Sequence, residues 1–278
     1  MTYRTVMVAL DGSPASTARV DVAIGLAQDF DAHLIGVAPT GWVDPPVDPS
    51  AAASLVEYGP SAWELLIDAA EAAADEFRLR CQASRLPSFE AMADQAAVAS
   101  SLADRAHCAD LLVMSQPDPD QPGHRQDRAA LEQVLLHSAR PVLVVPYTHQ
   151  GPMRWQQMLV GWDESREAVR AMTDALPLLR KAEKVLLAHW RQDPDGGRVL
   201  QRLHSMRQWL AFQGVEAQPQ DLVTRLAVGE AMLSAAADSG TDLIVMGAYS
   251  HARWAEVLFG GASRTLLDAM TVPVLMSH

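Results

Sequence analysis

The chain contains an internal repeat, and this repeat constrains its fold more than any other feature of the sequence. Residues 8–13 (VALDGS) match residues 160–165 (VGWDES) without gaps, at an offset of 152. Residues 110–115 (DLLVMS) match residues 242–247 (DLIVMG) at an offset of 132. At the second offset, Pro-Val-Leu also aligns with Pro-Val-Leu, at residues 141–143 and 273–275. The sequence therefore predicts a tandem duplication.

The two offsets differ by 20 residues, so the first copy contains extra chain in its middle. Residues 44–49 read DPPVDP, and proline lacks a backbone N–H and restricts the residue before it. This composition predicts an extra surface loop at about residues 41–60. The segment 146–152 predicts a short linker, which divides the chain into a first domain over residues 1–148 and a second over residues 153–278. Because the linker is short, we expect the halves to pack together.

Each copy alternates short β-branched runs with longer stretches of helical period, which is typical of parallel sheets with crossover helices. The sequence therefore predicts an α/β fold of two tandem domains, each a five-stranded parallel sheet sandwiched by helices. The predicted strands are 4–10, 32–38, 87–92, 110–115 and 141–146, then 157–162, 184–190, 215–219, 242–247 and 272–277. The helices predicted in the second copy are 164–181, 195–213, 227–238 and 259–270.

Charge and hydropathy exclude several classes of function. Lys and Arg number 22 against 34 Asp and Glu, and the net charge of -12 argues against a general nucleic-acid or anionic-membrane surface. No apolar stretch approaches the length of a membrane span. Strand-like residues begin almost at Met1, which leaves no room for a signal peptide. We therefore expect a cytoplasmic protein that has neither nucleic acid nor membrane as a partner.

One segment of the second copy has the pattern of a phosphate-binding site. Gly247 directly follows an apolar strand run, and Gly260 and Gly261 directly precede an amphipathic helix. Backbone N–H groups at a helix start lack partners within the helix and carry partial positive charge, so glycines there let an anion approach. Ligands of parallel α/β sheets bind beyond the carboxyl ends of the strands, where the strand order reverses. We therefore expect Asp163, at the end of strand one, to meet Gly247 at one cleft.

Three motifs recur in both halves and point to a known family. They are the strand followed by an Asp-x-Ser turn, at Asp11 and Asp163, the strand ending in Val-Met-Gly or Val-Met-Ser, and the final Pro-Val-Leu strand. On these motifs each half resembles a universal stress protein domain, over nearly the whole chain. The resemblance implies Rossmann-like domains of the adenine nucleotide alpha hydrolase-like type and a stress-response role. It also implies that the last strands pair as an internal pseudodimer, with a homodimer of chains as a further step.

The nucleotide-binding branch of that family has a glycine, two residues, a glycine, nine residues, and then a glycine followed by serine or threonine. Gly247 and Gly260 match the first and third glycines, whereas Ser250 and Gly261 depart from the motif. By this resemblance the second half binds ATP or a related adenine nucleotide, with Mg²⁺ as its phosphate-bound cation and His189 near the base. The residues implied for the site are Trp162, Asp163, His189, Met246, Gly247, Ser250, Gly260, Gly261, Ala262 and Ser263.

A purely structural interpretation of these residues stays open. Gly247 can serve a strand–helix crossing, and the paired glycines can simply precede a helix. Asp163 can be the N-cap of the helix after strand one, and for Asp11 this is the interpretation we favour. For Trp162 we favour packing between sheet and helix over stacking on a base.

The first copy lacks the glycine pattern of a phosphate-binding site at the equivalent positions. Its loop is acidic, with Asp120 and Asp127, and its prolines hinder an arrangement of N–H groups around a phosphate. We therefore expect no nucleotide in the first half. The residues that replace Gly247, Ser250, Gly260 and Gly261 are Ser115, Asp118, Arg128 and Ala129.

No P-loop, dinucleotide fingerprint, nucleophile elbow or zinc-protease motif is present, so the sequence predicts neither a catalytic centre nor a metal site. Three functions stay open. The first is a stress protein that binds an adenine nucleotide. The second is a non-nucleotide stress or interaction protein that acts through dimerisation or another small ligand. The third is a slow ATP hydrolase, ranked last because no general base or nucleophile set is visible.

Overall fold

The computed structural model describes residues 2–41, 49–192, 197–249 and 261–278. Its first half contains β1 (Thr5–Ala9), α1 (Pro14–Phe30), β2 (His33–Pro39), α2 (Pro49–Ala83), β3 (Phe89–Asp94), α3 (Val98–Ala106), β4 (Leu111–Ser115), α4 (His124–His137) and β5 (Val142–Val145). The second half contains β6 (Gln157–Gly161), α5 (Arg166–Leu179), β7 (Lys184–Arg191), α6 (Gly197–Phe212), β8 (Ala217–Val223), α7 (Val228–Ser239), β9 (Leu243–Gly247), α8 (Gly261–Ala269) and β10 (Val274–Ser277).

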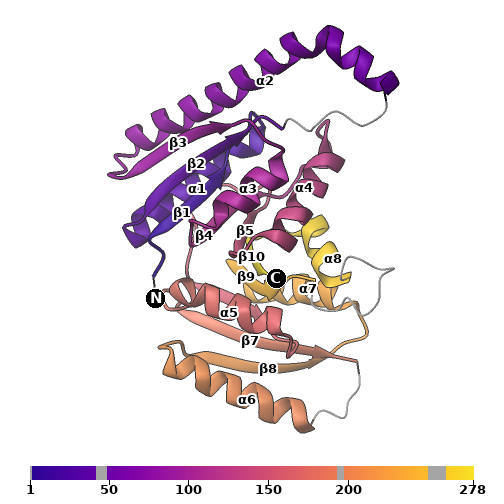
Figure 1. The fold of residues 1–278 in the computed structure, drawn as a ribbon. Helices are drawn as coiled ribbons and strands as arrows, with labels where there is room; N and C mark the ends of the chain where they lie inside the picture. Colours follow the sequence, from indigo (N-terminus) through magenta and orange to yellow (C-terminus); the bar gives the residue numbers. More distant parts are fainter. Residues whose placement is uncertain (1, 42–48, 193–196, 250–260) are drawn as a thin grey trace.

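The ten strands form one sheet in the order β3-β2-β1-β4-β5-β10-β9-β6-β7-β8 (Figure 1). Pairs within each half are parallel, so the predicted α/β fold with two five-stranded parallel sheets is confirmed. The halves join through β5 and β10, which pair antiparallel with Leu143 opposite Leu275. This confirms the predicted pairing of the last strands, which satisfies backbone groups that a free edge would leave unpaired. Association of two chains stays a prediction.

Helices cover both faces of the sheet because successive strand residues point to opposite sides. Val6 and Val8 pack with residues of α1, α2, α5 and α6 on one face. Met7 and Ala9 pack with residues of α3, α4, α7 and α8 on the other. Each of the two core clusters contains residues from both halves, so the hydrophobic core is continuous across the β5–β10 pair.

The extra segment of the first copy is mostly helical, so the predicted loop at about residues 41–60 is wrong from Pro49 onward. Helix α2 begins at Pro49 and continues for 35 residues, while residues 42–48 lie outside the described part of the chain. Proline is favoured in the first turn of a helix, where a missing N–H breaks no helical hydrogen bond. The following segment is rich in Ala, Leu and Glu, which have high helix propensity. In Figure 1, α2 extends past the end of β3.

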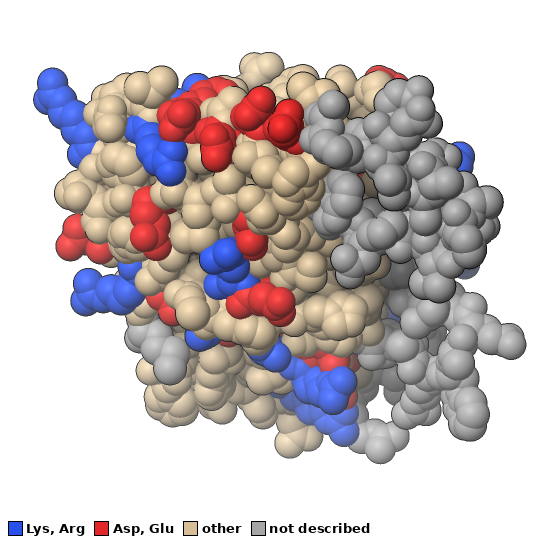
Figure 2. All heavy atoms as spheres, turned by 45° about the horizontal axis from the view of Figure 1, so that its top comes forward, with Lys and Arg blue, Asp and Glu red and all other residues tan. Residues whose placement is uncertain are grey.

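The surface seen in Figure 2 mixes both signs of charge. On that face, Lys and Arg of the described residues are scattered among Asp and Glu rather than gathered into one basic patch. Within the described ranges, no helix is both long enough and apolar enough to cross a membrane.

Candidate functional site

A cavity of about 380 Å³ lies at the carboxyl ends of β6 and β9, the neighbouring strands between which the strand order reverses. Residues from β6, β7, β9 and α8 meet there, although up to about a hundred positions separate them in the sequence. Of the residues implied for the site, Ser250 and Gly260 lie outside the described part of the chain. The others all line the cavity: Trp162, Asp163, His189, Met246, Gly247, Gly261, Ala262 and Ser263.

The cavity has an apolar wall, of which Trp162 and Met246 were predicted and Trp190 and Met232 were not. Trp190 of β7 and Met232 of α7 line it beside Trp162 and Met246, and all four side chains are buried. Strand periodicity places Trp190 on the same face as Ala188, which is a signal that sequence analysis can use. Met232 enters from a separate helix, so its place depends on packing. Trp162 also belongs to the core cluster on the α5 side, as expected for packing between sheet and helix.

The turn after β6 places Asp163 at the cavity and starts α5. Ser165 is the N-cap of α5, because its Oγ accepts a hydrogen bond from the Ala168 N–H at 3.0 Å. Asp163 Oδ1 accepts from the Ser165 N–H at 3.0 Å and from the Ser165 hydroxyl at 2.5 Å. The alternative interpretation of Asp163 as the N-cap of α5 is therefore wrong by two residues. The same holds for Asp11, which accepts from the Ser13 N–H at 2.9 Å while Ser13 occupies the cap position of α1.

His189 is held in one orientation at the end of β7. Its Nδ1 lies 2.8 Å from the carbonyl oxygen of Trp162, across the β6–β7 pair. A neutral imidazole that donates from Nδ1 has an acceptor lone pair at Nε2. His189 thus contributes a ring with a defined hydrogen-bonding edge to the cavity lining.

Gly247 and Gly261 differ in their surroundings. A Cβ atom on Gly247 would lie 2.6 Å from the backbone nitrogen of Ala168, so α5 needs a glycine at this crossing. A Cβ atom on Gly261 would have no neighbour within 4 Å among the described residues. Gly261 also lines the cavity, so among the described residues the start of α8 is uncovered there, as an anion site at a helix start requires.

Two loops that border this cavity contain residues in left-handed backbone conformation. Glu164 has φ 65° in the turn after β6, and Tyr249 has φ 56° after β9. This conformation costs free energy for residues other than glycine and clusters at functional sites. The Tyr249 N–H donates to Ser263 Oγ at 3.1 Å, which ties the loop to the first turn of α8. The Ser263 hydroxyl, predicted as a ligand contact, thus also holds the loop.

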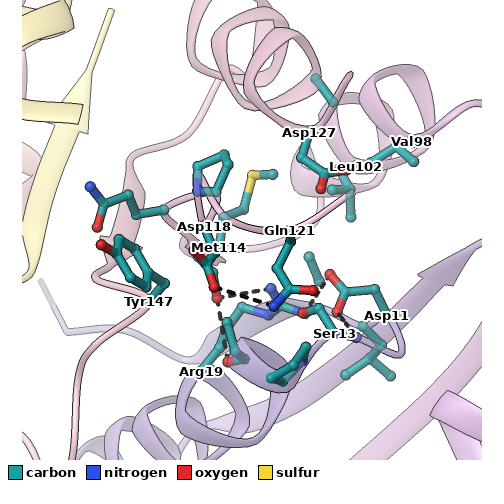
Figure 3. Close-up of a pocket in the computed structure, with 18 of the residues that line it drawn as sticks. Asp11, Ser13, Arg19, Val98, Leu102, Met114, Asp118, Gln121, Asp127 and Tyr147 are labelled. Atoms are coloured by element: carbon teal, nitrogen blue, oxygen red, sulfur yellow. Dashed lines mark hydrogen bonds and ion pairs between the residues drawn. The ribbon is translucent and has the colours of Figure 1, made fainter. Parts of the chain in front are cut away.

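The first half contains a smaller cavity of about 270 Å³ at the equivalent strand ends, which the sequence did not predict (Figure 3). Arg19 lies at its base with 3% of its side chain exposed. Its Nη2 lies 2.9 Å from Asp11 Oδ2, and its Nη1 donates to Ser115 Oγ at 2.9 Å. In the repeat, Ala171 and Gly247 stand where the first half has Arg19 and Ser115. In the first half, the Arg19 side chain and the Ser115 hydroxyl that it contacts therefore take the place of two small residues of the second half.

Among the described residues, three carboxylates and one arginine line this first-half cavity. Burial opposes ionisation of Asp11, but Arg19 and the Ser13 groups outweigh it, so the pKa of Asp11 lies below its usual value. Asp127 has no cationic partner within hydrogen-bonding distance among the described residues. Burial and the negative charge of Asp11 both raise its pKa. Asp118 also faces the cavity in Figure 3, so the lining disfavours a phosphate.

The chain matches known proteins in sequence profile and in fold. The profile of the Universal stress protein family matches it twice, over residues 2–146 and 154–278. The chain is similar in structure to a universal stress protein from Archaeoglobus fulgidus DSM 4304, with a TM-score of 0.62 at 17% identity, covering 98% of this chain and 95% of that one. It is also similar to a functionally unknown protein from Pseudomonas aeruginosa PAO1, with a TM-score of 0.60 at 14% identity, covering 99% and 92%. At these identities, the similarity shows a shared fold only. A search of curated proteins finds no match.

Proposed function

We propose that this chain, which belongs to the universal stress protein family, binds one adenine nucleotide in the cavity of its second half. The observation that carries the proposal is the pairing of an apolar wall with an open helix start in one cavity. The cavity volume of about 380 Å³ falls within the range of small-molecule sites, which is about 300–1,000 Å³.

The apolar wall suits the base. Trp190, Met232 and Met246 offer buried apolar surface for a flat aromatic ring. His189 lies at the same wall with its ring orientation set by the Trp162 carbonyl. The base would therefore lie over the ends of β6 and β7.

The start of α8 suits the phosphates. Gly261, Ala262 and Ser263 are its first residues, and their N–H groups precede the first complete helical turn. An anion there is also stabilised by the helix dipole. If ATP brings Mg²⁺, Asp163 is the carboxylate of the described lining that would contact the ion.

We propose a single site per chain. In the first half, Asp11, Asp118 and Asp127 line the equivalent cavity, and Arg19 offsets only one of these charges. Phosphate would meet net negative charge there. The first half would therefore serve as a partner and scaffold.

The decisive experiment looks for the nucleotide directly. The full chain is purified from cells and denatured, and the released small molecules are identified by mass spectrometry. Titration calorimetry with ATP, ADP and AMP then gives the affinity and stoichiometry, and we expect one site per chain. Absence of a nucleotide from the purified protein, with no calorimetric signal at millimolar concentration, would overturn the proposal.

A pair of variants separates binding from folding. Gly261→Val puts a branched side chain over the open helix start, so we expect the nucleotide Kd to rise about tenfold or more. Ala129→Val, at the equivalent position of the first half, is the matched control and should leave the Kd unchanged. Slow phosphate release from ATP that persists in Gly261→Val would point to a contaminating hydrolase rather than to this site.

We further propose a cytoplasmic stress-response role, which follows from family membership. The expected result is that protein abundance rises under growth arrest or starvation, measured by quantitative proteomics of cell fractions. Constant abundance under every stress applied would contradict the role without affecting the nucleotide proposal.

A further inference from the structure

The helix that starts at the proposed phosphate site depends on the other half of the chain at its far end. Helix α8 runs from Gly261 to Ala269. The Met270 N–H donates to the Leu266 carbonyl at 2.8 Å, and the carbonyls of the three residues after Leu266 lie past the last helical N–H groups that could reach them. A buried carbonyl without a partner is costly to the folded state. Two side chains of the first half contact this end of α8.

Gln116 supplies one missing partner. It follows β4, is buried, and its Nε2 donates to the Leu267 carbonyl oxygen at 3.0 Å. The backbone of Gln116 is itself held, because its N–H donates to the Val145 carbonyl at 2.7 Å. The cap on α8 therefore comes from a rigid position beside β5.

Arg128 supplies a positive charge at the end of α8. Asp268 lies in the last turn of α8, where the helix dipole disfavours a carboxylate. Arg128 Nη1 lies 2.8 Å from Asp268 Oδ1, and its Nη2 lies 3.5 Å from the Arg264 carbonyl. Glu132, one turn along α4, holds the guanidinium at 2.7 Å from the other side. The Arg128 side chain is 13% exposed and the Asp268 side chain 57%, so solvent partly screens this ion pair.

The equivalent residues of the second half cannot make the same contacts on the first half. By the repeat, Ala248 and Gly260 stand where the first half has Gln116 and Arg128, and neither has a side chain that donates hydrogen bonds. On its other side α8 packs closely on α7, because a Cβ atom on Gly229 would lie 2.8 Å from Thr265 Cβ. Helix α8 is thus held between α7 and the first half.

We propose that Gln116 and Arg128 are positioning residues. Through them the first half, which lacks the glycines of the proposed phosphate site, holds α8 and so sets the ligand site of the second half. The helix is short and stiff, so a displacement at Leu267 and Asp268 moves Gly261 at its start. The consequence for ligand affinity rests on the proposed function, whereas the effect on α8 itself does not.

The test compares Gln116→Ala and Arg128→Met in the full chain with Asp29→Ala. Asp29 also joins the halves, by accepting from Trp155 Nε1 at 2.7 Å and pairing with Lys181 at 3.4 Å, and it belongs to none of the contacts on α8. Hydrogen exchange by mass spectrometry, without ligand, measures the protection of α8 amides. Both test variants should speed exchange in α8 about five- to tenfold, and Asp29→Ala should leave it unchanged.

Calorimetry on the same variants measures the consequence for the site. We expect the AMP Kd to rise about three- to tenfold in both test variants and not in Asp29→Ala. Asp268→Asn removes the unfavourable charge, so in that background Arg128→Met should have a smaller effect on exchange. Circular dichroism and melting of each variant establish that it folds.

The outcomes separate the two proposals. If the unaltered chain binds no nucleotide, the proposed function fails, and exchange alone then judges the positioning of α8. If exchange in α8 is unchanged in both test variants, the positioning inference fails even though nucleotide binds. Faster exchange with an unchanged AMP Kd would overturn the link between α8 and the site.

Discussion

Gly247 at the end of β9 lies so close to Ala168 of α5 that a Cβ atom would stand 2.6 Å from the Ala168 backbone nitrogen. The chain needs a glycine at this crossing whether or not a ligand binds. A Cβ atom on Gly261, in contrast, would meet no atom of the described residues within 4 Å. The structural requirement for glycine therefore differs between these two positions of the candidate site.

Substitution of Gly247 by alanine should destabilise the fold. The added methyl group meets backbone atoms of Glu167 and Ala168, which cannot move without shifting α5. We expect a loss of about 2–3 kcal/mol in the free energy of unfolding, measured by urea denaturation. Gly261→Ala is the matched control and should stay within about 0.5 kcal/mol. Equal stability of the two variants would show that the crossing is looser than described.

Removal of Asp11 should destabilise the chain, because the buried Arg19 charge then loses its ion-pair partner. We expect Asp11→Ala to lose about 1–2 kcal/mol, less than for a fully buried pair because 50% of the Asp11 side chain is exposed. Adding Arg19→Met should recover part of that loss, because the unpaired charge is then gone. Asp21→Ala, which breaks the more exposed Arg80–Asp21 pair, serves as the control and should cost less than about 0.5 kcal/mol. No recovery in the double variant would contradict the argument.

Replacement of Arg85 by glycine should stabilise the chain slightly. Arg85 follows α2 with φ 53°, in the left-handed region that favours glycine. We expect a gain of about 0.5 kcal/mol, reduced by the greater freedom of glycine in the unfolded chain. The reverse change, Gly240→Ala at φ 66° after α7, should cost about 1 kcal/mol. Thermal melting of both variants is the measurement, and shifts of the same sign would contradict it.

Ionisation of the Asp127 carboxylate should lower the stability of the folded chain as the pH rises. Because burial and Asp11 raise its pKa in the folded chain, ionised Asp127 disfavours folding, and this penalty is complete once the pH exceeds the folded pKa. Asp127→Asn should therefore stabilise the chain at pH 7, and the gain should vanish below the unfolded pKa of about 4. The gain is small because the residue is only partly withdrawn from water, so solvent weakens both effects.

Denaturation curves from pH 3 to 7 measure this effect. Asp120 lies in the loop before α4, outside the cavity lining, and Asp120→Asn is the control. A variant Asp127→Asn that is less stable than the unaltered chain at pH 7 would disprove the assignment.

Several features of the candidate site were predictable because they follow from local rules. Asp163, His189 and Gly247 each lie within two residues of the carboxyl end of a strand, and parallel strands bring these ends to one edge of the sheet. The helical part of the extra segment was missed because a proline run was interpreted as a loop, although Pro49 starts a helix. The cap position of α1 was placed at Asp11 instead of Ser13, because aspartate and serine are equally good N-cap residues and the sequence alone does not choose between them.

The tandem repeat and its strand periodicity were enough to predict two α/β domains, because alternation along a strand depends only on nearby residues. The pairing of the last strands was predicted from the resemblance to the universal stress protein family. The burial of Arg19 and the contacts of Gln116 and Arg128 with α8 were decided by the tertiary structure alone. Each joins segments about a hundred residues or more apart, through side chains whose partners exist only once helices have packed on the sheet. Periodicity indicates which face of an element is buried, whereas the identity of the facing residue depends on how the two halves pack.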